Sequence, residues 1–79
     1  LKTAAEYKEW GRVFSRAFNQ LKSHVAYSME HVIHSYGATN EAEFFAVITE
    51  TFLEKPAELR RYDPEIYRLL VDYYQFDPI

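Results

Sequence analysis

The stretch that decides the fold runs from a short turn into an apolar helix: Tyr36-Gly37-Ala38-Thr39-Asn40-Glu41-Ala42-Glu43-Phe44-Phe45-Ala46-Val47. Asn40 is a favoured N-cap residue, so the pattern predicts a helix over about 41–53. That segment has almost no polar face, which is typical of a central helix buried on all sides. A carboxylate such as that of Glu43 is costly to bury there unless it is hydrogen-bonded, paired or bound to a metal.

A long amphipathic helix is predicted upstream, over about 4–26. Thr3 and Glu6 fit a capping box, in which both side chains satisfy free amide groups at the helix start. Apolar residues then recur at steps of three and four and line one face: Tyr7, Trp10, Phe14, Ala17, Phe18, Leu21 and Val25. Gly11 costs about 1 kcal/mol relative to alanine in a helix interior, and we interpret it as a point of close packing.

The remaining segments complete an all-α prediction. Residues 28–39 break the helical period and are interpreted as a connector that carries function, with at most one short strand near Val32. Lys55-Pro56 ends the central helix and begins a helical turn at 56–61. Asp63 caps a further helix, with Pro64 in its first turn. We therefore expect three main helices, over about 4–26, 41–53 and 64–75, plus the short turn.

Composition excludes several classes of function. The 79 residues allow at most one small domain, and the net charge of −3 comes from interspersed acids and bases. No basic stripe is present to neutralise phosphates, so we expect no nucleic-acid partner. The longest apolar run, 44–48, is too short for a bilayer and no signal peptide is visible, so we expect no membrane partner. The absence of cysteine fits a reducing cytoplasm.

Glu43 and Tyr36 each have two interpretations. Glu43 lies at the third helical position, where it closes a capping box with Asn40. A carboxylate on a buried helix is also a common third zinc ligand beside two histidines. The phenol of Tyr36 suits hydrogen bonding to an oxyanion at a zinc-bound carbonyl, or it is simply a partly buried tyrosine with a satisfied hydroxyl. Gly37 beside it is expected to let the backbone turn sharply toward a cleft.

Glu50 and the histidines complete the candidates. Glu50 lies seven residues beyond Glu43, on the same face, where it either orients a metal-bound histidine or is a solvated glutamate. His31 and His34 have the spacing of a metal pair, but the surrounding sequence argues against a helix and favours a structural or exposed role. His24 has no partner in the sequence and is predicted to be exposed.

Taken together, these segments resemble the C-terminal part of the MtfA (Mlc titration factor A) family of zinc-dependent metallopeptidases. The resemblance covers essentially all 79 residues. Besides residues 36–47 as quoted above, the matching positions are Glu50, Phe52, Glu54-Lys55-Pro56 and Tyr73-Tyr74-Gln75-Phe76-Asp77-Pro78, with Tyr7-Lys8-Glu9-Trp10 and Val13-Phe14 upstream.

The resemblance implies a function and a site. In that family an H-E-x-x-H helix and a later glutamate hold zinc, and the glutamate of the motif is the general base. The resemblance implies that Glu43 is the third zinc ligand and that Tyr36 is the tyrosine that stabilises the transition state. It also implies a cytoplasmic, aminopeptidase-like enzyme that acts on peptide substrates and has the glucose repressor Mlc as a partner.

The sequence departs from the family in one respect, because no H-E-x-x-H occurs in it. We therefore expect residues 1–79 to be a single C-terminal fragment of a metallopeptidase catalytic domain, truncated or left by proteolysis. Alone it should bind no zinc and be inactive, since catalytic zinc needs three protein ligands. An apolar face of the helix carrying Glu43 would be uncovered, which predicts self-association. The alternative is a non-catalytic helical module with its own complete core, which binds a protein partner through its aromatic surface.

Overall fold

The computed structural model describes residues 3–27 and 32–79, and this part of the chain is helical. The elements are α1 (Ala4–Ala26), the 3₁₀ helix η1 (Ser35–Ala38), α2 (Glu41–Glu54), α3 (Pro56–Tyr62) and α4 (Pro64–Tyr74). No strand occurs in the described residues, and Val32 lies in a bend, so the all-α prediction is confirmed. Each predicted helix end that lies in this part agrees with the structure to within one residue.

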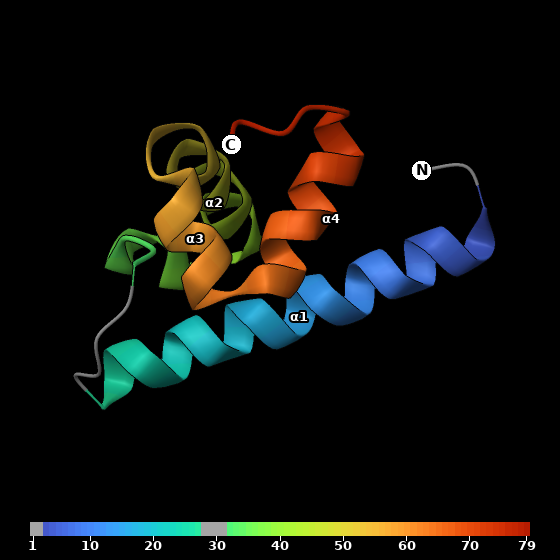
Figure 1. The fold of residues 1–79 in the computed structure, drawn as a ribbon. Coiled ribbons are helices and arrows are strands. Elements are labelled where there is room, and N and C mark those ends of the chain that lie inside the picture. The colour runs from blue at the N-terminus through green and yellow to red at the C-terminus, as the bar shows by residue number, and fades with distance from the viewer. Residues whose placement is uncertain (1–2, 28–31) are drawn as a thin grey trace.

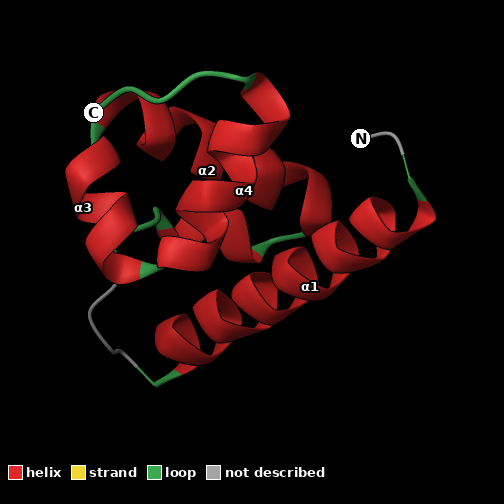
Figure 2. Cartoon of the chain, turned by 45° about the vertical axis from the view of Figure 1, so that its right-hand side comes forward, coloured by secondary structure: helices red, strands yellow, loops and turns green. Residues whose placement is uncertain are grey.

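The long helix α1 lies along one side of the group formed by α2, α3 and α4 (Figures 1 and 2). A helix of this length extends about 34 Å, which is close to the longest dimension of the molecule, 37 Å. The N-terminal half of α1 therefore continues past α4 as a projecting arm (Figure 1). The 3₁₀ helix η1 packs against both α1 and α2.

Three predicted side-chain caps are present. The hydroxyl of Thr3 accepts from the amide of Glu6 at 3.1 Å, and Asn40 Oδ1 accepts from the amide of Glu43 at 2.9 Å. Asp63 Oδ1 accepts from the amide of Ile66 at 3.2 Å. Each bond satisfies an amide that has no partner inside its own helix. These local signals explain why the helix starts were predictable.

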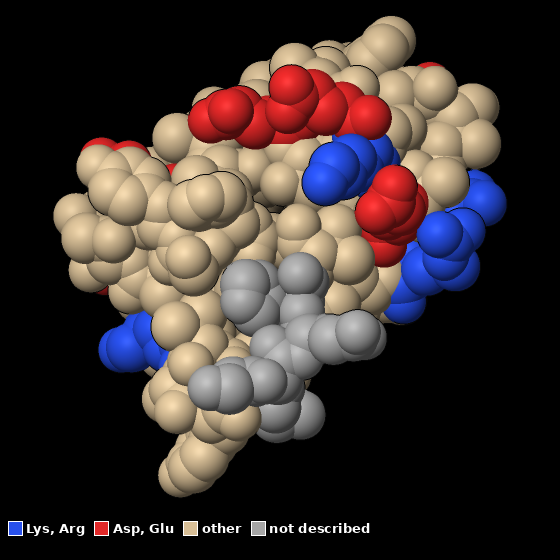
Figure 3. All heavy atoms as spheres, turned by 90° about the vertical axis from the view of Figure 1, so that its left-hand side faces the viewer, with Lys and Arg blue, Asp and Glu red and all other residues tan. Residues whose placement is uncertain are grey.

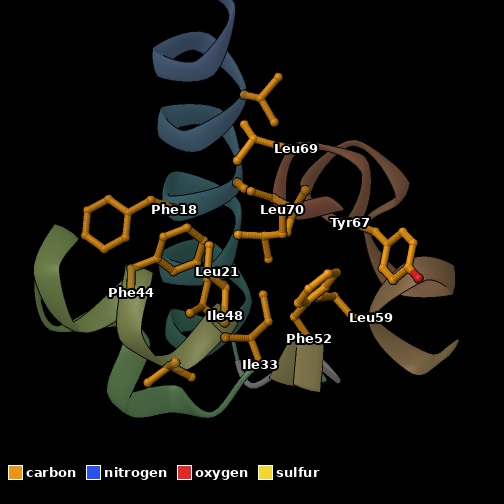
Figure 4. Packing of buried hydrophobic residues seen from close by; sticks show 14 residues of the cluster. Phe18, Leu21, Ile33, Phe44, Ile48, Phe52, Leu59, Tyr67, Leu69 and Leu70 are labelled. Carbon is orange, nitrogen blue, oxygen red and sulfur yellow. The ribbon is translucent and has the colours of Figure 1, made fainter. Parts of the chain in front are cut away.

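The core lies where α2 faces the other helices (Figure 4). Phe44 of α2 contacts two rings of α1, with centroids 5.1 Å from Phe14 and 5.4 Å from Phe18. Burying a side chain of this size contributes roughly 1.5–3 kcal/mol. Almost fully buried side chains come from α1, α2, α3 and α4 and from the segment that precedes η1. They are Leu21, Ile33, Phe44, Ile48, Phe52, Leu59, Ile66 and Leu70.

An ion-pair network that the sequence did not suggest joins α1 to the start of α4. Arg16 binds both oxygens of Asp63, at 2.8 and 2.9 Å, and the Asp63 side chain is only 5% exposed. Glu65 accepts from Arg16 at 2.9 Å and from Arg12 at 2.8 Å. Arg12 also binds Glu9, one turn away on α1. The N-cap of α4 is thus fixed directly to α1.

Candidate active-site surface on α2 and η1

Glu43 lies in the first turn of α2, and its side chain is partly exposed. Its backbone amide is capped by Asn40, but no hydrogen bond or ion pair reaches its carboxylate from residues 3–27 and 32–79. Only half of the predicted capping box has formed. The carboxylate oxygens of Glu43 are therefore available to a group from outside the described part of the chain.

Glu50 lies two turns further along the same side of α2 and is exposed. Ala46 and Leu53 share this side, and Leu53 is 58% exposed. The almost wholly apolar pattern predicts a helix buried on all sides, but in these 79 residues α2 has the uncovered face that we expected in the absence of a larger domain. Its neighbours cover only the opposite side, where the buried residues are Phe44, Val47, Ile48, Thr51 and Phe52.

Tyr36 lies in η1 and is 55% exposed. Its backbone amide donates to Nδ1 of His34 at 3.0 Å, so His34 acts as the cap of this short helix. The hydroxyl of Tyr36 has no hydrogen-bond partner in the described residues. The two interpretations of Tyr36 therefore both stay predictions, whereas the structural role favoured for His34 is confirmed.

Gly37 positions η1, but not through a sharp turn. No glycine in the described part has a positive φ. Instead, a Cβ atom at Gly37 would lie 3.2 Å from Cδ2 of Leu21 and 3.4 Å from Cβ of Val47. The glycine is needed because η1 approaches α1 and α2 closely, and this contact holds Tyr36 at the surface beside α2.

A hollow of about 610 Å³ brings Tyr36 and Glu50 together. Sequence reasoning assigned no role in a site to other polar residues of its wall, notably Ser35, Glu54 and Lys55. Glu54 could have been found from its four-residue spacing from Glu50, which places both carboxylates on one side of α2. Glu43 does not line this hollow. The structure therefore brings two of the three candidates into one cavity and places Glu43 nearer the start of the same helix.

The histidines do not add metal ligands to this surface. His31 lies outside the described residues. His24 is half-buried and its Nδ1 lies 2.6 Å from the hydroxyl of Tyr62, so the prediction that it is exposed is wrong. Among residues 3–27 and 32–79, no three His, Cys, Asp or Glu side chains gather closely enough to hold a metal ion. The described residues alone do not fit a zinc ion, and Glu43 offers a single donor.

The side of the molecule at the left of Figure 1 carries charges of both signs (Figure 3). Acidic side chains form a band there, with basic side chains beside it and uncharged surface over much of the rest. No helix in the described part is long and apolar enough to cross a bilayer.

One of the comparisons with known proteins identifies a family. A family model described as glucose-regulated metallo-peptidase M90 matches residues 1–75. The chain is 42% identical over 74 residues to an uncharacterized protein of Synechocystis sp., an alignment that covers 94% of this chain and 27% of that protein. The chain thus spans 27% of the length of the curated relative it matches. No solved structure matches it.

Proposed function

Because the chain belongs to the glucose-regulated metallopeptidase M90 family, we propose that it is the C-terminal part of the catalytic domain of a zinc-dependent, aminopeptidase-like enzyme. In this proposal Glu43 is the third zinc ligand, and an H-E-x-x-H helix outside this chain supplies two histidines and the general base. Zinc bound there would polarise a peptide carbonyl and activate water. The 79 residues alone would be inactive, since they offer one donor where three are needed.

The observation that carries this proposal is the unpaired carboxylate of Glu43. A capped, well-packed helix holds it on the side of α2 that this chain leaves uncovered. Its oxygens form no bond within the described residues, so nothing must be broken before they bind a metal. A ligand held on a rigid helix is also more precisely placed than one on a loop.

Tyr36 and Glu50 have supporting roles in the proposal. The unpaired hydroxyl of Tyr36 would donate a hydrogen bond to the oxyanion that develops on the scissile carbonyl. Glu50 lines the same hollow and would accept a hydrogen bond from a metal-bound histidine, fixing the orientation of its ring. The hollow would then form part of the wall that faces the peptide substrate.

The test uses the longer protein that contains these residues and compares two single substitutions. Glu43→Ala should lose both bound zinc and peptide hydrolysis, because a donor is removed. Its fold should survive, since the bond to Asn40 uses the backbone amide. Glu41→Ala, an exposed carboxylate of the same helical turn, is the matched control and should retain both. Full zinc content and turnover in Glu43→Ala would refute the proposal.

The non-catalytic helical interaction module remains the second candidate. The observation in its favour is that the described residues form a buried hydrophobic cluster of their own while large aromatic side chains stay exposed, including Tyr73 and Phe76. This candidate requires no metal, so the zinc content of the longer protein distinguishes the two functions. If the longer protein is isolated without bound zinc and binds a protein partner tightly, the interaction module is favoured.

The partners and the location follow from the same proposal. The longer protein would act on peptides in the cytoplasm and would contact the Mlc repressor, as the resemblance implies. The isolated chain would self-associate through the exposed side of α2 around Leu53. Sedimentation at increasing concentration should show a rise in mass, which Leu53→Glu should abolish. A monomer at every concentration would contradict self-association.

A further inference from the structure

His34 is the N-cap of η1, and it accepts a hydrogen bond through a ring nitrogen. Its Nδ1 atom lies 3.0 Å from the backbone amide of Tyr36, which donates to it. The side chains that favour an N-cap position, those of asparagine, aspartate, serine and threonine, accept through an oxygen. An amide or hydroxyl oxygen accepts at any pH, whereas an imidazole nitrogen accepts only while it carries no proton. The cap of η1 is therefore of a kind that a proton can remove.

The bond to Tyr36 fixes the protonation state of the His34 ring. A backbone amide N–H can only donate, so Nδ1 is the acceptor and the hydrogen of the ring lies on Nε2. The imidazole is therefore neutral in this arrangement. An imidazolium carries a hydrogen on both nitrogens, and it would place one N–H group against the other. The geometry described here and a charged His34 exclude each other.

The capped amide belongs to the residue whose phenol is the proposed oxyanion donor. η1 packs against α2 and against α1, near the C-terminal end of α1 (Figure 1). Gly37 holds the middle of η1 through its close approach to Leu21 and Val47. Tyr36 comes one residue earlier, in the turn that the cap fixes. Because its side chain is 55% exposed, packing constrains it little, and the backbone of η1 sets where the phenol lies.

The ionisable groups around His34 are those that line the same hollow. α2 contributes Glu50 and Glu54, Lys55 follows at its C-terminal end, and η1 contributes the phenol of Tyr36. In the described part of the chain, α1 adds no residue to this wall. Of these side-chain types, only imidazole ordinarily changes charge between about pH 5 and pH 8. A change in η1 within that interval is therefore expected to follow His34.

We propose that His34 is a positioning residue for Tyr36 and that it acts only while its imidazole is neutral. This inference rests on the role proposed above for the Tyr36 phenol. The neutral ring caps η1 and holds the phenol where the oxyanion develops. When Nδ1 takes up a proton from solvent, the amide of Tyr36 loses this acceptor and the phenol is no longer held in place. Hydrolysis that depends on Tyr36 therefore declines as the pH falls from about 8 to about 5.5.

The first test follows the bond itself in the longer protein, by nuclear magnetic resonance with heavy nitrogen in histidine and tyrosine. Loss of signals in His34→Asn and in Tyr36→Phe assigns the two residues. At about pH 8 the His34 ring should have a bare Nδ1 and a protonated Nε2. As the pH falls, the Tyr36 amide signal should shift with the same midpoint as the ring. In His34→Asn it should not shift, because Oδ1 of asparagine takes the place of Nδ1 and accepts at every pH.

The second test measures peptide hydrolysis by the longer protein. His34→Asn should have the kcat of the parent at about pH 8 and exceed it about fivefold at about pH 5.5, because its cap persists. His34→Ala lacks an acceptor, so its kcat should already be about fivefold lower at about pH 8, with KM little changed. His24→Asn is the matched control, since its ring faces the hydroxyl of Tyr62 instead. It should keep the pH profile of the parent.

A double substitution shows whether the effect passes through the phenol. If His34 acts by placing Tyr36, then adding His34→Ala to Tyr36→Phe should lower kcat no further. A further fivefold loss in the double variant would mean that His34 affects hydrolysis by another route, which contradicts the proposal.

Three other results would overturn the proposal: a proton on Nδ1 at about pH 8, a Tyr36 amide signal that does not follow the ring of His34, and the same pH dependence of kcat in His34→Asn and the parent. Failure of the proposed function has a different signature. If the longer protein does not hydrolyse peptides, that function is refuted, and the resonance titration still decides whether neutral His34 holds Tyr36.

Discussion

Arg16 of α1 donates two hydrogen bonds, of 2.8 and 2.9 Å, to the two carboxylate oxygens of Asp63, the N-cap of α4. The same carboxylate caps the amide of Ile66. One buried aspartate thus both starts α4 and attaches it to α1, although 47 residues separate the ion-paired groups. The pairing is bidentate, which is the strongest arrangement available to arginine and a carboxylate.

Replacing Asp63 should therefore cost more than the loss of a cap alone. Asp63→Ala should lower the free energy of unfolding by about 2 kcal/mol, roughly half from the cap and half from the ion pair, discounted because Arg16 is partly exposed. Asp63→Asn keeps a capping oxygen and should lose about half as much. Urea unfolding followed by circular dichroism measures both. Equal losses in the two variants would show that the cap contributes nothing, whereas a stable Asp63→Asn variant would show that the charge contributes nothing.

Acid should weaken the same junction. The guanidinium of Arg12 lowers the pKa of Glu65 and of Glu9 below the ordinary 4.5. Away from this junction, the hydroxyl of Tyr67 lowers the pKa of Asp77 in the segment after α4. A lowered native pKa stabilises the fold fully above the ordinary value, and that stability is lost as the pH falls through the lowered pKa. The melting temperature should thus decline below about pH 4.5.

Glu65→Gln separates this effect from general acid unfolding. Its melting temperature should be lower at neutral pH, and its decline below pH 4.5 should be shallower than that of the parent, because one of the linked carboxylates is gone. Parallel curves for the two proteins would contradict the assignment of the acid response to this junction.

The two glycines should respond in opposite directions to a larger side chain. Gly37→Val places methyl groups against Leu21 and Val47 and should destabilise the fold by about 1–3 kcal/mol through overpacking. Gly11→Ala, the matched control, should stabilise it by about 1 kcal/mol. Thermal and chemical unfolding measure both changes. Stabilisation by Gly37→Val would mean that η1 does not approach the helices as closely as described.

Tyr36→Phe tests the role proposed for the phenol in the longer protein. Since the hydroxyl has no partner in the described residues, its removal should leave stability unchanged. If it binds the oxyanion, kcat should fall by about a hundredfold while KM changes little, because the bond forms only in the transition state. Tyr27→Phe, also an exposed tyrosine, should leave kcat unaltered. Parent-like kcat in Tyr36→Phe would exclude this role.

Local signals account for what was predictable from the sequence. Thr3, Asn40 and Asp63 mark helix starts through bonds that reach only three residues, and Pro56 and Pro64 sit where proline is tolerated. The fold class and the helix boundaries followed from these. The family followed from a resemblance centred on residues 36–47, and that resemblance, not spacing, implied the roles of Glu43 and Tyr36.

Long-range contacts account for what was not predictable. Which side of α2 is exposed depends on which neighbours reach it, and the almost wholly apolar pattern of that segment does not identify it. The bond between His24 and Tyr62 and the network around Asp63 join residues far apart in sequence, so no local pattern reveals them. Glycine occurs both at sharp turns and where two backbones approach closely. The sequence around Gly37 suggested a turn, and only the contacts of Gly37 with other helices show that it is a close approach.

The coordination of zinc in the longer protein tests the central claim most directly. Crystals of that protein, measured at the zinc absorption edge, would locate the ion by its anomalous scattering. The account predicts a carboxylate oxygen of Glu43 at about 2.0–2.2 Å from the ion, beside two histidines from an H-E-x-x-H helix. A zinc ion whose protein ligands are complete without Glu43, with that carboxylate left in solvent, would contradict it.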